Sequence, residues 1–217
     1  MFYQAYQSGI SMKTKLTSGA SLLFLLSLAI LLTIYLAWIL YPFEISWLNL
    51  TNRVHLKSDI IQYNFHILMD YLTNPFNPVL EMPDFPSSES GLHHFAVVKG
   101  LFHLTQGVAL VTLPFFYIFW NQVVRKGFLS LYRKTLVFMV GLPVGLGLFG
   151  VFIGFERFFT LFHQFLFVGD DTWLFDPAKD PVILILPENF FLHCFILFFV
   201  TYEILFGLFY FKSRRML

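Results

Sequence analysis

The chain has 217 residues, of which 57% belong to the apolar set AVILMFWYC and only 12% are charged, and its net charge is +1. A soluble domain usually carries about a quarter charged residues, so this composition excludes a water-soluble fold. The low charge and the single cysteine also exclude a disordered chain and a disulfide scaffold. Near-neutral charge gives no indication of nucleic-acid binding. The composition therefore predicts an integral membrane protein.

Four apolar stretches are long enough to cross a bilayer. A hydrocarbon core of about 30 Å needs about 20 consecutive apolar residues in a helix. Three stretches contain no charged side chain and the fourth contains only Glu203; they are residues 16–43, 100–124, 135–155 and 189–211. We expect an all-α integral membrane protein with four transmembrane helices.

The basic residues predict the orientation of these helices. Nine of the 14 Lys and Arg residues fall in segments 1–15, 125–134 and 212–217, which contain no acid. Because Lys and Arg favour cytoplasmic loops, we expect both termini in the cytoplasm. The lysines before the first stretch resemble the start of a signal peptide, but the stretch is too long for a signal-peptide core. We therefore expect an uncleaved anchor in a multi-pass protein of the cell membrane.

This topology divides the chain into cytoplasmic, membrane and extracytoplasmic parts. Twelve of the 13 acids and at least five of the seven histidines fall outside the membrane on the extracytoplasmic side. We expect the two outer segments to pack together as a small cap that carries the chemistry. The predicted parts are 1–43 (cytoplasmic tail and first helix), 44–98 (cap), 99–155 (second and third helices with a short basic loop), 156–188 (cap) and 189–217 (fourth helix and basic tail).

Two elements are predicted within the cap. Apolar and aromatic residues recur at helical spacing and predict an amphipathic helix against the membrane interface; they are Leu56, Ile60, Tyr63, Ile67 and Tyr71. In the second outer segment, Pro181 and Pro187 flank residues 182–186, which are rich in β-branched side chains. This pattern indicates a short strand.

The candidate chemistry lies in two segments at the membrane boundary. The sequence contains no common hydrolase signature, no Walker loop and no paired-cysteine metal site, and the default role of Cys194 is packing. Segment 84–99 contains His93 and His94 and leads into the second helix. Segment 156–191 contains His163 and leads into the fourth.

These two segments, in a four-span chain of this size, resemble the bacterial lipoprotein intramolecular transacylase family (Lit). The second segment carries most of the resemblance, with Phe-His at 162–163, Asp-x-Trp-x-x-Asp-Pro at 171–177 and Pro-Glu-x-Phe-Phe at 187–191. In the first segment His94 and Lys99 keep the family spacing, but Val97 stands where the family has an acid. This departure puts a role for that acid in doubt and leaves His94 in place.

The resemblance implies an acyltransferase that needs no cofactor or metal. Its reaction moves the sn-2 acyl chain of a lipoprotein's S-diacylglyceryl group to the α-amino group of the same N-terminal cysteine, giving a lyso-form lipoprotein. The implied partners are the diacylated lipoprotein and membrane lipid, with no nucleic acid, and the implied active site is at the outer leaflet. The catalytic histidines of the family correspond to His94 and His163.

The residues agree with this chemistry on independent grounds. An α-amino group with a pKa of about 8 must lose a proton before it attacks an ester, and a histidine with a pKa of about 6.5 is a suitable base. A second histidine can protonate the departing glyceryl oxygen or stabilise the oxyanion. Because amine and ester belong to one molecule, proximity replaces an enzyme nucleophile. The sequence leaves open which histidine is the base.

Other residues in the cap are expected to bind or orient the substrate. Aromatic residues around His163 are expected to line an acyl chamber; they are Phe158, Phe159, Phe162, Phe165, Phe167 and Trp173. Charged residues are expected to hold the loops or contact substrate; they are Lys99, Arg157, Asp171, Asp176 and Glu188. Three residues of the amphipathic helix, Tyr63, Asn64 and Tyr71, are expected to close the chamber.

Two other functions fit parts of the sequence. In a metal-dependent membrane hydrolase, His93 or His94 would bind zinc together with His163 and Asp171, although these residues lack the spacing of a zinc motif. A non-enzymatic membrane protein would recognise a lipid or lipopeptide through the cap. Metal analysis of the purified protein distinguishes the transacylase from the hydrolase, and chemical conversion of a lipoprotein distinguishes it from the binding protein.

Overall fold

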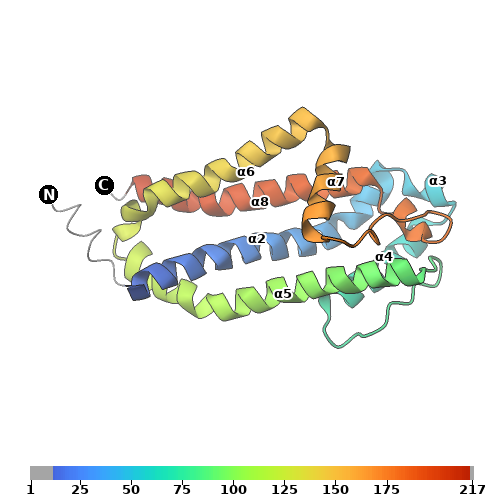
Figure 1. Cartoon of the computed structure of the whole chain (residues 1–217), viewed down its shortest axis with the longest axis horizontal. Helices are drawn as coiled ribbons and strands as arrows, with labels where there is room; N and C mark the ends of the chain where they lie inside the picture. The colour runs from blue at the N-terminus through green and yellow to red at the C-terminus, as the bar shows by residue number, and fades with distance from the viewer. Residues whose placement is uncertain (1–11, 216–217) are drawn as a thin grey trace. The chain divides into compact units, whose positions relative to one another are not determined.

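The computed structural model describes residues 12–215, in which all regular structure is helical (Figure 1). The four long helices are α2 (Met12–Trp47), α5 (Glu89–Phe119), α6 (Arg133–Ile153) and α8 (Glu188–Arg214). Four helices within the described chain are long and apolar enough to cross a membrane, which confirms the four predicted spans. The expected N-terminal tail, residues 1–11, and the last two residues of the C-terminal tail lie outside the described residues.

Shorter helices connect the long ones. They are α3 (Leu50–Val54), α4 (Ser58–Thr73), the π-helical turn η1 (Trp120–Val124), the 3-10 helices η2 (Phe128–Tyr132) and η3 (Pro181–Leu184), and α7 (Phe155–Leu166). Gly154 joins α6 to α7 with φ 86°, a conformation that favours glycine because other side chains clash there. Figure 1 shows α7 turning away from the line of α6 at this residue.

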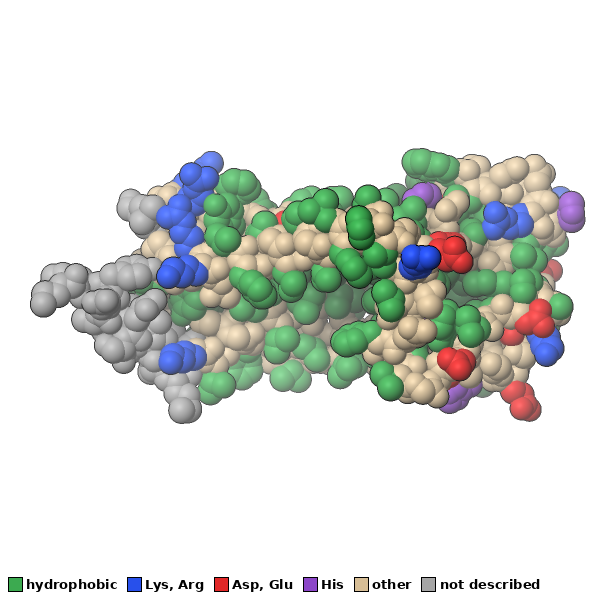
Figure 2. All heavy atoms as spheres, turned by 45° about the horizontal axis from the view of Figure 1, so that its top comes forward, with side chains coloured by type: hydrophobic (Ala, Val, Ile, Leu, Met, Phe, Trp, Pro, Cys, Tyr) green, Lys and Arg blue, Asp and Glu red, His purple; other side chains and the backbone are tan. Residues whose placement is uncertain are grey.

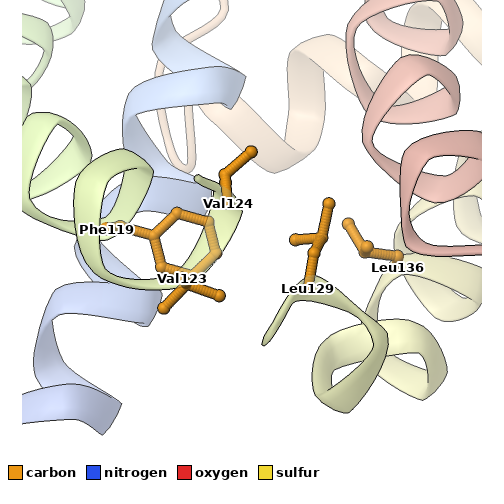
Figure 3. Close-up of a cluster of buried hydrophobic side chains, with 5 residues drawn as sticks. All are labelled: Phe119, Val123, Val124, Leu129 and Leu136. Carbon is orange, nitrogen blue, oxygen red and sulfur yellow. The ribbon is translucent and has the colours of Figure 1, made fainter. Parts of the chain in front are cut away.

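The described residues form two compact units, and the long helices contribute to both. The first unit comprises the described residues within Met1–Leu31, Thr105–Val144 and Phe199–Leu217. Its core is a cluster around the turn that follows α5, shown in Figure 3, which consists of Phe119, Val123, Val124, Leu129 and Leu136. Ser18 Oγ donates a hydrogen bond to the Tyr132 hydroxyl at 2.9 Å beside this cluster. These contacts hold the ends of α2, α5 and α6 together.

The second unit comprises Leu32–Leu104 and Gly145–Phe198. At its core the Tyr41 ring of α2 stacks on Phe65 of α4 with ring centroids 3.5 Å apart, and Phe190 of α8 meets Tyr41 edge-on at 5.5 Å. The buried Tyr41 hydroxyl donates to the Ile185 carbonyl at 2.8 Å, so its polar group is satisfied. The unit is therefore built around an aromatic contact that joins three helices.

Charged residues are unevenly divided between the two units. All seven histidines and every acid except Glu203 belong to the second unit, whereas most Lys and Arg residues belong to the first. Figure 2 shows most of the Asp, Glu and His side chains in one part of the surface, where some Lys and Arg side chains lie as well. The expected concentration of acids and histidines in one part of the molecule is therefore present in the fold.

The predicted strand at 182–186 is wrong. This segment contains the 3-10 helix η3, which begins with Pro181, and no other part of the described chain is a strand that could pair with it. Proline presets a helical φ angle and is favoured at the first position of a helix. Val182 and Ile185 are fully buried, so the β-branched side chains serve packing instead of sheet formation.

The amphipathic helix is present as α4, but of the predicted apolar stripe only Tyr71 is buried. Tyr63 of that stripe is 59% exposed. Asn64 is fully buried, because its side chain donates to Asp84 Oδ2 at 2.7 Å and accepts from the Asp84 backbone N–H at 3.2 Å. These bonds attach the loop that follows α4. The buried side chains of α4 are Ile61, Asn64, Phe65, Leu68, Met69, Tyr71 and Leu72.

Candidate active site

A cavity of about 320 Å³ lies within the second unit. Its walls come from α2, α4, α5, α7, α8 and the segment between α7 and α8. The lining is almost entirely aliphatic and aromatic, and no Asp, Glu, Lys or Arg side chain belongs to it. Proteins bind small molecules in pockets of about 300–1,000 Å³ with a few polar groups on apolar walls. The polar or weakly polar side chains in this lining are Thr33, His94, His163, Trp173 and Cys194.

His94 lies in the second turn of α5 and is 6% exposed. Its ring centroid is 4.9 Å from that of Phe167, and Phe175 meets the ring edge-on at 5.4 Å. Its Nδ1 atom is buried and has no hydrogen-bond partner in the described part of the chain. The ring is held by aromatic packing, and this nitrogen is available to a bound molecule.

His163 lies on α7 and contributes a second imidazole to the cavity wall. Its Nδ1 atom lies 2.8 Å from the Phe159 carbonyl oxygen. Because a carbonyl oxygen only accepts, Nδ1 carries the proton of the neutral ring and Nε2 keeps a lone pair. Burial lowers the pKa of His163, although the bond to Phe159 opposes this effect. The neutral ring, with a basic Nε2, is thus the favoured form.

The two rings face a common region of the cavity. The ring centroids of His94 and His163 are 6.3 Å apart, with an interplanar angle of 31°. Phe167 packs against both rings, and the Trp173 ring lies 4.8 Å from that of His163. Two imidazoles and an indole N–H therefore surround one apolar space.

The structure also separates His94 from its neighbour His93. His93 is on a different face of α5 and does not line the cavity. Its side chain is 60% exposed, and Nε2 lies 3.2 Å from Asp170 Oδ2. Hydrogen bonds from Thr172, with a smaller contribution from His93, lower the pKa of Asp170. Of the adjacent pair, His94 alone is placed to meet a molecule in this cavity.

The start of α5 is fixed by a buried carboxylate that sequence reasoning did not select. Asp180 is 3% exposed and accepts hydrogen bonds from the Ser88 N–H and hydroxyl, both at 2.7 Å. The orphan N–H groups of a first helical turn favour such an anionic partner. A side chain at Gly91 would collide with Asp180, so glycine permits this close approach. The Asp180 contact places the turn that carries His94.

Four of the twelve predicted site residues line the cavity: His94, His163, Phe162 and Trp173. Two others pack against each other elsewhere, since Lys99 Nζ lies 4.3 Å from the Tyr71 ring centroid and donates to the Asn77 carbonyl. Asn64 bonds to Asp84, as described above. The remaining five residues are exposed and do not line the cavity; they are Tyr63, Arg157, Asp171, Asp176 and Glu188.

The aromatic chamber is only partly formed by the predicted residues. Phe159, Phe162, Phe167 and Trp173 line the cavity, but Phe165 is 81% exposed and Phe158 packs on Phe195. The walls from α2 and α4 carried no sequence signal, because their residues there read as ordinary apolar side chains. Phe95 and Phe175 also line the cavity, and both lie within the two resembling segments. The aromatic positions of these segments are the sequence signal that identifies them.

Within residues 12–215, no three His, Cys, Asp or Glu side chains are grouped closely enough to hold a metal ion. The ligand set suggested for a zinc hydrolase, His93 or His94 with His163 and Asp171, is not such a group. The site described so far is a pair of histidines in an apolar cavity.

The family model described as "Lipoprotein intramolecular transacylase Lit" matches residues 15–191. The chain belongs to the Lit family. The solved structure of the membrane integral lipoprotein intramolecular transacylase Lit from Bacillus cereus is 31% identical to the chain, covers 94% of each chain and superposes with a TM-score of 0.83. Together with the four spans, this similarity establishes a multi-pass membrane protein.

Two further Lit structures from Bacillus cereus, in which one histidine is replaced by arginine or by alanine, also match. They are 28% and 30% identical, with TM-scores of 0.73 and 0.74, and the matches cover 98% of this chain and 96% of theirs. A comparison with curated proteins finds no match.

Proposed function

We propose that this chain is a lipoprotein intramolecular transacylase that moves the sn-2 acyl chain of an S-diacylglyceryl group to the α-amino group of the same N-terminal cysteine. Membership of the Lit family supports this proposal. The observation that carries it is the pair of imidazoles, 6.3 Å apart, on the wall of an apolar cavity. The cavity lining suits an acyl chain, and the rings suit proton transfer at its ester end.

His163 is the base in this proposal. Its Nδ1 proton is engaged by the Phe159 carbonyl, so Nε2 can take the proton of the attacking amine. The amine nitrogen forms a bond to the ester carbonyl carbon, and the bond from that carbon to the glyceryl oxygen then breaks. Because amine and ester are parts of one molecule held in one cavity, much of the acceleration comes from proximity.

His94 returns the proton to the leaving group. It gives its own N–H proton to the departing glyceryl oxygen and takes up the one held by His163, so it is neutral before and after the reaction. Its packing between Phe167 and Phe175, with Nδ1 unpartnered in the described chain, supports this relay. In sum one proton moves from nitrogen to oxygen, and neither water nor an enzyme nucleophile is consumed.

The membrane orientation follows from the charges. We place both termini and the basic connection 125–134 in the cytoplasm, and the segments 44–98 and 156–188 outside, because most basic residues lie in the first unit. The second unit, with the cavity and all histidines, is then at the outer leaflet, where it meets a diacylated lipoprotein and membrane lipid.

Mass spectrometry of a reporter lipoprotein tests the proposal. The reaction is an isomerisation, so the expected product has unchanged mass, fragment ions of an N-acyl cysteine and no free amine. The variants His94→Ala and His163→Ala should abolish conversion. His93→Ala is the matched control, and it should leave conversion within a few-fold of the wild-type rate, because the His93 side chain is exposed and does not line the cavity.

Other products would contradict the proposal in different ways. Loss of an acyl chain with addition of water would indicate a hydrolase. Tight binding of the lipoprotein without any change in its structure would indicate a lipid-binding protein. Full conversion by His163→Ala would show that His163 is not the base.

A further inference from the structure

The indole of Trp173 has an unused donor at the candidate site. Trp173 lines the cavity, and its Nε1 atom is buried without a hydrogen-bond partner in the described residues. An indole N–H can only donate, and leaving a buried donor unpaired costs free energy. The cavity lining offers it no partner, so a bound molecule is the available source of an acceptor.

The position of Trp173 is fixed before any substrate binds. Asp170 accepts hydrogen bonds from the Thr172 N–H and hydroxyl at 2.9 and 2.6 Å, and also contacts His93 at 3.2 Å. After Trp173, the Phe175 N–H donates to the Trp173 carbonyl at 3.1 Å, and the Phe175 ring packs against His94. The indole is thus held from both sides, in a turn attached to the start of α5.

The imidazole that packs against this indole indicates which acceptor the N–H meets. The Trp173 ring lies 4.8 Å from the His163 ring, and His163 is the proposed base. An acyl chain that enters an apolar cavity brings one polar group with it, the ester. The ester carbonyl must lie near His163 for the amine to attack it, and its oxygen becomes negatively charged as the tetrahedral intermediate forms.

We propose that Trp173 is a further catalytic residue, whose indole N–H donates a hydrogen bond to the carbonyl oxygen of the reacting ester and stabilises the oxyanion. This inference rests on the proposed transacylase function and divides its work among three rings. His163 takes the amine proton, His94 delivers a proton to the glyceryl oxygen, and Trp173 binds the carbonyl oxygen. A preorganised donor on an apolar wall is effective because it needs no reorganisation.

The variant Trp173→Phe tests this role, since it keeps an aromatic ring and removes the indole N–H. Loss of one oxyanion donor lowers kcat by about 10²- to 10³-fold. We expect that loss with little change in KM and no change in the acid limb of the pH profile, because His163 remains. Trp38→Phe is the matched control: it removes an indole N–H that bonds to His66 outside the cavity, and it should leave kcat within a few-fold.

A substrate with a thionoester at sn-2 separates the donor from mere packing. Sulfur accepts hydrogen bonds weakly, so the wild-type protein should process this substrate more slowly than the ester. If the N–H meets this atom, Trp173→Phe and the thionoester should be non-additive, with little further loss in combination. Additive losses, or an unchanged kcat in Trp173→Phe, would overturn the role of Trp173. The transacylase proposal is tested separately, because it depends on conversion of the lipoprotein by the wild-type protein.

A measurement on the wild-type protein applies even if the variant does not fold. With ¹⁵N-labelled tryptophan, binding of an N-acetylated diacyl lipopeptide, which has no free amine and cannot react, should shift the Trp173 indole proton downfield. A shift confined to other tryptophans would contradict the proposal.

Discussion

The contact between Gly91 and Asp180 makes a quantitative prediction about the start of α5. In Gly91→Ala the new Cβ would lie 2.2 Å from Asp180 Oδ1 and 2.9 Å from its Cγ, so the carboxylate must move. Asp180 would then lose its bonds to the Ser88 N–H and hydroxyl. Hydrogen bonds to charged groups contribute about 1.5–3 kcal/mol each, and alanine in a helix returns at most about 1 kcal/mol. We expect Gly91→Ala to lose about 2–5 kcal/mol of unfolding free energy.

Gly100→Ala is the matched control on the same helix. A Cβ at Gly100 meets nothing within 4 Å, so this variant should be as stable as the wild type or slightly more stable. Thermal unfolding in detergent, followed by circular dichroism, measures the difference, which should be on the order of 10 °C. Transacylation at a temperature where both variants are folded should also be slower in Gly91→Ala, because the displaced turn carries His94. Equal melting temperatures of the two variants would refute the reasoning.

Four further predictions concern the base, the cavity and the cap. Burial lowers the pKa of His163, and only the neutral ring takes a proton. The transacylation rate should therefore fall on the acid side with a midpoint below pH 6.5. A midpoint at or above pH 6.5 in the pH–rate profile would contradict the role of His163 as the base. The same shift means that the unfolded chain protonates His163 at a higher pH than the folded protein does. The free energy of unfolding should therefore decrease as the pH falls below about 6.5. Ala37→Leu narrows the cavity and should slow long acyl chains more than short ones in a competition between two lipoproteins, whereas equal slowing would place the chains elsewhere. Asn64→Ala leaves Asp84 without its buried partner and should lower the free energy of unfolding, measured by thermal unfolding, by about 1–3 kcal/mol. The control Asn52→Ala, at an exposed residue, should lower it by almost nothing. Similar losses in the two variants would contradict the structural role of the bonds between Asn64 and Asp84.

The elements that could be predicted depend on local sequence. A membrane span needs only length and apolar side chains, so hydropathy located all four helices. His94, His163, Phe162 and Trp173 lie within short segments that resemble a known family, and the fold brings these four to one cavity. The residue chosen between His93 and His94 by its spacing to Lys99 is also the one that lines the cavity.

The elements that could not be predicted depend on partners far away in the sequence. Both faces of α4 carry apolar residues, and the face with Asn64 is buried because Asp84, twenty residues later, satisfies its amide. Lys99 was expected to hold a loop or contact substrate, and its partners, the Asn77 carbonyl and the Tyr71 ring, could not be read from the sequence. The η3 segment has the composition of a strand, yet a strand needs a partner, and none is present in the described chain. Such choices are fixed by tertiary contacts that composition does not encode.

The placement of charge explains how one pair of histidines could suffice for the proposed reaction. Carboxyl groups of the second resembling segment make their hydrogen bonds outside the cavity: Asp180 binds Ser88 of the first segment, and Asp170 binds Thr172. No ionised side chain lines the cavity, and a carboxylate beside His163 would raise its pKa and keep it protonated. Burial favours the neutral forms of both the imidazole and an entering α-amino group, so the nucleophile loses its proton where it is needed. The same apolar walls exclude water, which would otherwise compete with the amine for the ester, and they leave the Trp173 dipole unscreened.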